Sequence, residues 1–147
     1  MARKVFFSFQ YEDVHRAMNV RNSNVIASDQ KVGFIDKADF EEVERQGDAA
    51  IKKWINDQLH GTSVTVVLVG ATTDKSKWVK YEIEQSIARG NGILTIDISQ
   101  ISDLNGKTTT CCSLRVPGAT HYLWNKDNGR ENLGKWVEAA AKAAGKQ

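Results

Sequence analysis

The sequence predicts a single α/β domain, in which a doubly wound parallel sheet of about five strands lies between two layers of helices. Short apolar runs alternate with amphipathic segments along the chain, and one strand–helix–strand unit is especially clear. The 147 residues, of which 41% are hydrophobic and 26% charged, suit one domain with a core of its own. We therefore expect residues 1–147 to form one domain with the strand order 2-1-3-4-5.

The N-terminal part begins with an apolar run, Lys4–Phe9, which predicts a buried first strand. Residues 12–18 can form a helix, whereas the Asn-rich stretch at 19–24 is poor helix material. We expect an irregular or interrupted segment here. The next apolar run, Lys31–Ile35, predicts a short second strand.

A long helix is expected between the second and third strands. Asp39 is the predicted N-cap, and the apolar residues of the inner face extend to Leu59. Gly47 lies inside this helix and is a candidate break, because glycine is costly in a helix interior.

The clearest unit occupies residues 62–98. The β-branched run Val64–Val69 predicts a strand buried on both faces. A polar turn follows, in which Asp74 or Ser76 can cap a helix, and apolar residues then recur at helical spacing from Trp78 to Arg89.

The same unit ends in another strand. Val79, Ile83 and Ile87 should form the buried face of the helix, Gly90 should end it, and Ile93–Ile98 predicts a strand. Two strands joined by a helix are expected to be parallel neighbours in one sheet.

The C-terminal third is predicted to be mainly loop, strand and helix. The polar stretch Ser99–Gly118 reads as a loop with at most a turn of helix. His121–Trp124 predicts the last strand, and Asn125–Arg130 a loop. An amphipathic closing helix follows and should stop at Gly145.

Glu82 is the strongest candidate for a catalytic residue. Most helical glutamates lie on a solvated face with a basic residue three or four positions away, as Glu84 does with Lys80. Glu82 instead lies at the border of the buried stripe, one turn after Trp78, and no basic residue stands at that spacing. An ordinary surface role therefore explains Glu84 better than Glu82.

The predicted topology gathers further candidates near this residue. Ligands of doubly wound sheets bind beyond the carboxyl ends of the strands. Phe9 and Gln10 follow the first strand and Thr72 follows the third, while Trp78 belongs to the first turn of the next helix. Aromatic and amide groups around one carboxylate suit a nucleotide or nucleoside.

Composition and missing motifs exclude several other classes. A net charge of +2 is too near balance to favour nucleic acid, and no apolar run could span a membrane or form a signal peptide. The three histidines lack metal-site spacing, and the adjacent Cys111 and Cys112 are expected to be reduced. We expect a cytoplasmic protein without metal, cofactor, nucleic acid or membrane partner. P-loop, phospho-acceptor and nucleophile-elbow patterns are also missing.

The sequence resembles the TIR and TIR-like domains, a flavodoxin-like group of folds. The resemblance rests on the opening strand Val5–Phe9, on the helix Lys77–Ile83 with its Trp-x-x-x-Glu signature, and on the strand that follows Gly90. It is closer still to the TIR-like proteins of the Thoeris anti-phage defence system, and covers most of residues 3–140.

The resemblance implies an NAD-consuming enzyme. In the family, the glutamate that matches Glu82 is catalytic, and the tryptophan that matches Trp78 lines the pocket. Groups after the first strand, here Phe9 and Gln10, are expected to hold the base. Asn19, Arg21 and Asn22 match a similar segment and are candidates either for binding the pyrophosphate or for capping an irregular turn.

Thoeris-type relatives convert NAD into a small signal derived from ADP-ribose, often cyclic, which activates a partner effector. Self-association and a phage-derived trigger are the partners that this resemblance implies. The segment Ser99–Gly118 could cover the pocket and so favour a cyclic product. Three alternatives stay open: a simple NAD-depleting hydrolase, a TIR-type interaction module without turnover, and a nucleotide-binding domain without turnover.

Overall fold

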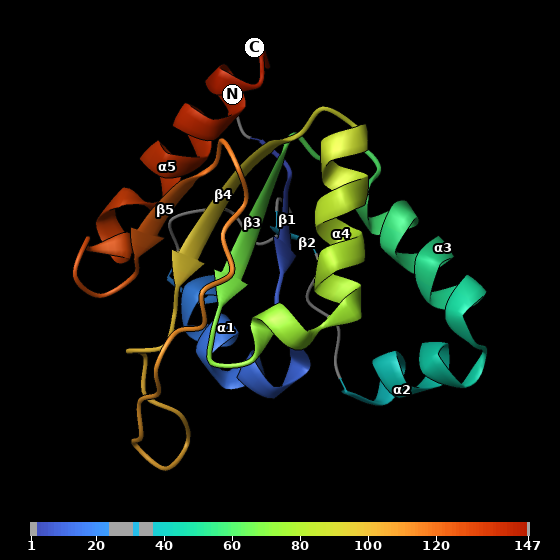
Figure 1. The fold of residues 1–147 in the computed structure, drawn as a ribbon, viewed down its shortest axis with the longest axis horizontal. Coiled ribbons are helices and arrows are strands. Elements are labelled where there is room, and N and C mark those ends of the chain that lie inside the picture. Colours follow the sequence, from blue (N-terminus) through green and yellow to red (C-terminus); the bar gives the residue numbers. More distant parts are fainter. Residues whose placement is uncertain (1–2, 24–30, 33–36, 147) are drawn as a thin grey trace.

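The computed structural model describes residues 3–23, 31–32 and 37–146 (Figure 1). Its strands are β1 (Val5–Ser8), β2 (Lys31–Val32), β3 (Val64–Val69), β4 (Gly92–Asp97) and β5 (Thr120–Leu123). Its α-helices are α1 (Val14–Arg21), α2 (Lys37–Arg45), α3 (Asp48–Leu59), α4 (Lys77–Ala88) and α5 (Gly129–Ala143). The α/β class predicted from the sequence is confirmed.

All described strand pairs of the sheet are parallel. The strands lie in the order β2-β1-β3-β4-β5. The outer strand β2 is only two residues long, and the rest of the predicted run at 33–35 lies outside the described residues. The body of the sheet is therefore β1-β3-β4-β5, with β3 and β4 at its centre.

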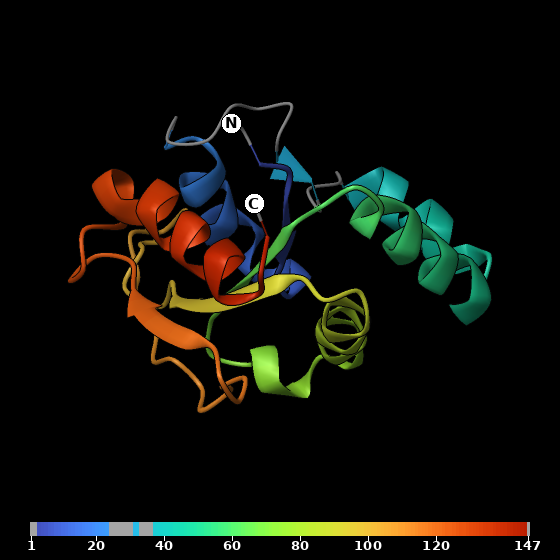
Figure 2. The same cartoon turned by 90° about the horizontal axis from the view of Figure 1, so that it is seen from above.

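Helices cover both faces of this sheet, as Figure 2 shows from above. Ala17 and Val20 of α1 pack with the buried residues of α5 on one face. Helices α3 and α4 lie on the other face, where Phe6 contacts Ile51 and Ile55 of α3. Because side chains of a strand alternate between faces, Ser8 lies on the same face as Phe6.

The β3–α4–β4 unit follows the prediction closely. All six residues of β3 are buried, and the Ser76 hydroxyl accepts a hydrogen bond from the Val79 N–H at 3.2 Å, which caps α4. The expectation for Ile87 was wrong, since this side chain is 58% exposed. The buried face of α4 is instead formed by Val79, Glu82, Ile83 and Ser86, so the stripe shifts toward the polar side of the helix.

The single long helix predicted before β3 is two helices. Gly47 separates α2 from α3 and has a φ of 95°, a left-handed conformation that glycine adopts without a steric penalty. Helix α2 begins at Lys37, so the predicted cap Asp39 lies inside it. Helix α1 also continues farther than expected, through Arg21.

The connection from β4 to β5 has neither helix nor strand at residues 98–119. We call residues 99–118 the crossover segment. Its later part runs over the face of the sheet that carries α4 (Figure 1), where Cys111, Leu114 and Val116 pack near Val79 and Ile83. The predicted loop after β5 is shorter than expected, because α5 begins at Gly129. Within the described residues, no helix is long and apolar enough to cross a membrane.

Candidate active site

The site is built around Glu82, in the second turn of α4. Its side chain is turned toward the sheet and is only 8% exposed. The hydroxyl of Ser8, at the carboxyl end of β1, donates a hydrogen bond to Oε1 of Glu82 at 2.5 Å. Among the described residues, no lysine, arginine or histidine forms an ion pair with this carboxyl group. The group is thus buried with a neutral partner.

Burial changes the acidity of this group. Loss of hydration disfavours the charged form and raises the pKa of Glu82 from about 4.5 to about 8, while the hydrogen bond from Ser8 acts in the opposite direction. Near neutral pH the free protein therefore holds Glu82 mostly as the neutral acid. A cation placed beside it would favour the carboxylate.

The loops after β1 and β3 contact each other. The Thr72 hydroxyl donates a hydrogen bond to Oε1 of Gln10 at 2.9 Å and also contacts Glu12. The backbone N–H of Gly70 donates to the Thr73 hydroxyl at 2.8 Å, which shapes the start of the same loop. Gln10 and Thr72, two of the residues predicted for substrate binding, are thus brought together.

Trp78 lies one turn before Glu82 and is half-buried. Its ring packs against the cluster formed by Phe6 and the inner face of α3, and meets Tyr81 edge-on with centroids 6.0 Å apart. The ammonium group of Lys77 lies 4.7 Å from the centre of the Trp78 ring. One part of the indole is therefore core, and the rest is partly exposed.

The other predicted contacts lie elsewhere. Phe9 packs against the hydrophobic cluster on the face of α1 and α5. Asn19 and Arg21 belong to α1, where the Asn19 amide donates to the backbone carbonyl of His15 at 3.1 Å. Asn22 ends the same helix. The structure places these four residues on or beside elements that cover the opposite face from Glu82.

Sequence reasoning missed Ser8 as a partner of Glu82. A signal was present, because Ser8 is a polar residue inside an apolar strand and has the same parity as the buried Phe6. Ser8 and Glu82 are 74 residues apart in sequence, so their hydrogen bond could not be inferred without knowing how α4 packs on β1. Asp13 and Arg16, both buried after β1, were missed as well.

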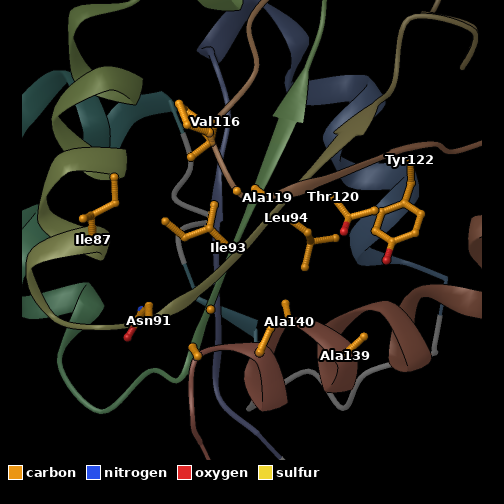
Figure 3. A pocket seen from close by; sticks show the side chains of 15 residues that line it. Ile87, Asn91, Ile93, Leu94, Val116, Ala119, Thr120, Tyr122, Ala139 and Ala140 are labelled. Atoms are coloured by element: carbon orange, nitrogen blue, oxygen red, sulfur yellow. The ribbon is translucent and has the colours of Figure 1, made fainter.

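Two pockets lined by described residues are separate from Glu82. One has a volume of about 320 Å³ and lies at the amino ends of β4 and β5, bordered by Ile87, Pro117 and Ala140 (Figure 3). The second, of about 490 Å³, lies beyond the carboxyl ends of β4 and β5, next to Asp97 and Trp124. Neither is lined by Ser8 or Glu82.

Burial shifts the acidity of one cysteine and one histidine. Burial raises the pKa of the Cys111 thiol to about 11, which disfavours the nucleophilic thiolate. The Thr95 hydroxyl and Nδ1 of His121 lie 2.7 Å apart, and burial lowers the pKa of this imidazole. In the part of the chain that the structure describes, no three His, Cys, Asp or Glu side chains cluster as metal ligands do.

Comparison with known proteins identifies the family. The sequence profile described as "Thoeris protein ThsB, TIR-like domain" matches residues 6–103, about two thirds of the chain. The chain belongs to the Thoeris ThsB family of TIR-like proteins. A relative from Bacillus cereus (strain MSX-D12) bears the name "Putative cyclic ADP-D-ribose synthase ThsB1". It is 37% identical over 143 residues, which are 93% of this chain and 72% of the relative.

A solved structure supports the same fold. The TIR domain of the Toll-related receptor TRR-2 from Hydra magnipapillata superposes on this ThsB-family chain with a TM-score of 0.57. The match covers 96% of this chain and 99% of the receptor domain at 10% sequence identity. Similarity at this level concerns the fold, and the predicted TIR-like architecture is confirmed.

Proposed function

We propose that this ThsB-family protein cleaves the bond between nicotinamide and ribose in NAD, with Glu82 as the catalytic carboxylate. One observation carries the proposal: Glu82 is buried on the sheet face, hydrogen-bonded to Ser8, and forms no ion pair with a described basic residue. Such a carboxyl group has no competing basic partner among the described residues, so its negative charge can stabilise a positively charged substrate. The name of the B. cereus relative and the family membership support the same substrate.

Cleavage of this bond requires little more from the protein than one negative charge near the ribose. Nicotinamide is a cationic leaving group, which departs as a neutral molecule with the electron pair of the glycosidic bond. No strong general acid is needed, and one carboxylate can stabilise the oxocarbenium-like ribose in the transition state. The positive ring of the bound substrate would also lower the pKa of Glu82 and so produce the carboxylate where it is used.

Substrate contacts are proposed for Trp78 and for the Gln10–Thr72 pair. Trp78 offers an indole edge to a ring, and the Gln10–Thr72 pair offers amide and hydroxyl groups to ribose or base. The positions of Phe9, Asn19, Arg21 and Asn22 on the face of α1 favour packing and helix termination for these residues instead.

We expect a cyclic or otherwise conjugated ADP-ribose as the main product. Water must be excluded for a second group of the same substrate to capture the ribose cation, and the crossover segment packs beside α4 in the right place to do this. Mass spectrometry separates cyclic from linear ADP-ribose by one water. A linear product from the earliest time points would support the NAD-depleting hydrolase, and no nicotinamide at all would support the interaction module.

Ser8 is expected to set the pH at which the enzyme works. Its hydrogen bond lowers the pKa of Glu82, so Ser8→Ala should move the rising limb of kcat/KM to higher pH and reduce nicotinamide release at pH 7 by roughly tenfold. Ser86→Ala is the matched control, because the Ser86 hydroxyl is also buried but donates to the backbone carbonyl of Glu82 and not to its carboxyl group. If the rising limb of the kcat/KM profile of Ser8→Ala lay at the same pH as in the unchanged protein, this role would be contradicted.

The product is proposed to act as a signal on a separate effector, as expected for Thoeris defence, after self-association or a phage-derived trigger has activated the protein. A rate of NAD turnover that is constant per molecule from dilute to concentrated protein would contradict activation by self-association.

A further inference from the structure

Arg16 holds the crossover segment through its main chain. The Arg16 side chain lies in α1 and is only 8% exposed. Nε donates a hydrogen bond to the carbonyl of Ile101 at 2.7 Å, and Nη2 donates to the carbonyl of Lys107 at 3.0 Å. The guanidinium group thus bridges two main-chain carbonyls, six residues apart, in a segment that has no helix or strand of its own.

The same guanidinium is linked to the rim of the candidate active site. Nη1 of Arg16 lies 3.5 Å from Oδ1 of Asp13, which is 3% exposed. Asp13 in turn lies directly against Gly70, where the methyl carbon of an alanine would come within 2.2 Å of Oδ2. Gly70 begins the loop that carries Thr72.

The crossover segment also contacts Gly70. The backbone N–H of Cys112 donates to the Gly70 carbonyl at 3.0 Å, and the N–H of Thr109 donates to the carbonyl of Ser99 at 2.9 Å. Three loops, after β1, β3 and β4, therefore meet at Gly70. The Arg16 side chain, in the helix that follows the first of these loops, is bonded to the last of them.

From this geometry we infer that Arg16 is a positioning residue which, by holding the crossover segment against the rim at Gly70, decides whether the ribose cation is captured by the substrate or by water. The inference rests on the proposed NAD cleavage. The hydrogen bonds of Arg16 go to the crossover segment and to Asp13, and the Glu82 carboxyl is bonded to Ser8, so the bond-breaking step itself is left to other residues.

Both outcomes start from the same cleavage. The bond between ribose C1′ and the nicotinamide nitrogen breaks, and nicotinamide leaves with the electron pair. Water then attacks C1′ and loses a proton, which gives linear ADP-ribose. Alternatively, a ring nitrogen or hydroxyl of the same substrate attacks C1′, and one proton is released with a cyclic product. A loose crossover segment admits water and favours the first outcome.

Arginine suits the role of bridging the crossover segment and Asp13 because of the shape of its side chain. A planar guanidinium can donate to Ile101, Lys107 and Asp13 at once, whereas the ammonium of lysine is a single point at the end of a flexible chain. Arg16→Lys keeps the positive charge beside Asp13 but loses the bridge. Asp103→Ala loosens the same segment from within, since Oδ1 of Asp103 accepts hydrogen bonds from the N–H groups of Asn105 and Lys107 and its Oδ2 lies 4.0 Å from Nη2 of Arg16.

The test measures two quantities on the full chain with NAD as the probe: the ratio of linear to cyclic product by mass spectrometry, and hydrogen exchange of the amides at 101–112. In Arg16→Lys and Asp103→Ala we expect this ratio to rise about tenfold and the exchange to accelerate. Arg3→Lys is the matched control, because Arg3 pairs with Glu138 at 2.8 Å on α5, and both quantities should stay unchanged.

The results separate this inference from the proposed function. If the unchanged protein releases no nicotinamide, the proposed function is wrong. If it releases nicotinamide but its product is linear from the start, or if the product ratio of Arg16→Lys and Asp103→Ala equals that of the unchanged protein, the role of Arg16 is overturned. Unchanged exchange at 101–112 in both variants would overturn the role as well, because the segment would then be held without Arg16.

Discussion

Glu82→Gln is expected to reduce nicotinamide release from NAD by about 100-fold to 1000-fold, the effect of removing one electrostatic group from a transition state. Glutamine has nearly the size of glutamate and can still accept the hydrogen bond from Ser8. It cannot carry the negative charge that stabilises the ribose cation. Chromatography of NAD incubated with a high concentration of purified protein measures the effect.

Glu84→Gln is the control for this variant. Glu84 lies on the same helix two residues farther on, but its side chain is exposed. The same chemical change there should leave nicotinamide release within about twofold of the unchanged protein, as surface substitutions usually do. If Glu82→Gln kept the full rate, Glu82 would not be the catalytic group.

Glu82→Gln should also stabilise the folded protein at high pH. The pKa of Glu82 is about 8 in the folded state and close to 4.5 when the chain is unfolded. Between these values the folded state holds a proton that the unfolded state has released, so stability falls as pH rises through this window. Glutamine has no such proton. Its advantage should grow from nearly zero at about pH 4 to on the order of 5 kcal/mol above pH 8.

Urea unfolding of both proteins at several pH values tests this expectation. The difference in the free energy of unfolding between Glu82→Gln and the unchanged chain should depend on pH, while the corresponding difference for the exposed Glu84→Gln should not. A difference for Glu82→Gln that is the same at every pH would show that loss of hydration does not raise this pKa. The sequence alone places Glu82 only at the border of the buried stripe, and its full burial makes this effect large.

Much of the fold could be predicted because local patterns and tertiary structure agree. The β-branched run Val64–Val69 forms a fully buried strand, and Ser76 caps the helix that carries Glu82. Glu82 itself could be singled out because a charged residue without a basic neighbour on a half-apolar helix has an unusual position. Gly47, an uncommon residue in a helix interior, correctly marked a break.

The residues around Glu82 were harder to predict. The rule that ligands bind beyond the carboxyl ends of strands selects loops, but it does not say on which face of the sheet a side chain lies. Phe9 and Gln10 are neighbours in sequence, yet Phe9 packs toward α1 and α5 while Gln10 contacts Thr72. Ile87 has the spacing of a core residue but lies near the end of α4, where its side chain extends into solvent.

The crossover segment is fixed partly through its main chain. Arg16 binds the carbonyls of Ile101 and Lys107, and the N–H of Cys112 binds Gly70. Contacts of this kind do not depend on the side chains at the bonded positions, so the sequence can diverge where the segment's side chains do not pack against the sheet, while its path is kept. Natural variation concentrated at these positions would let related proteins acquire new products during evolution without rebuilding the sheet that holds the catalytic carboxyl group.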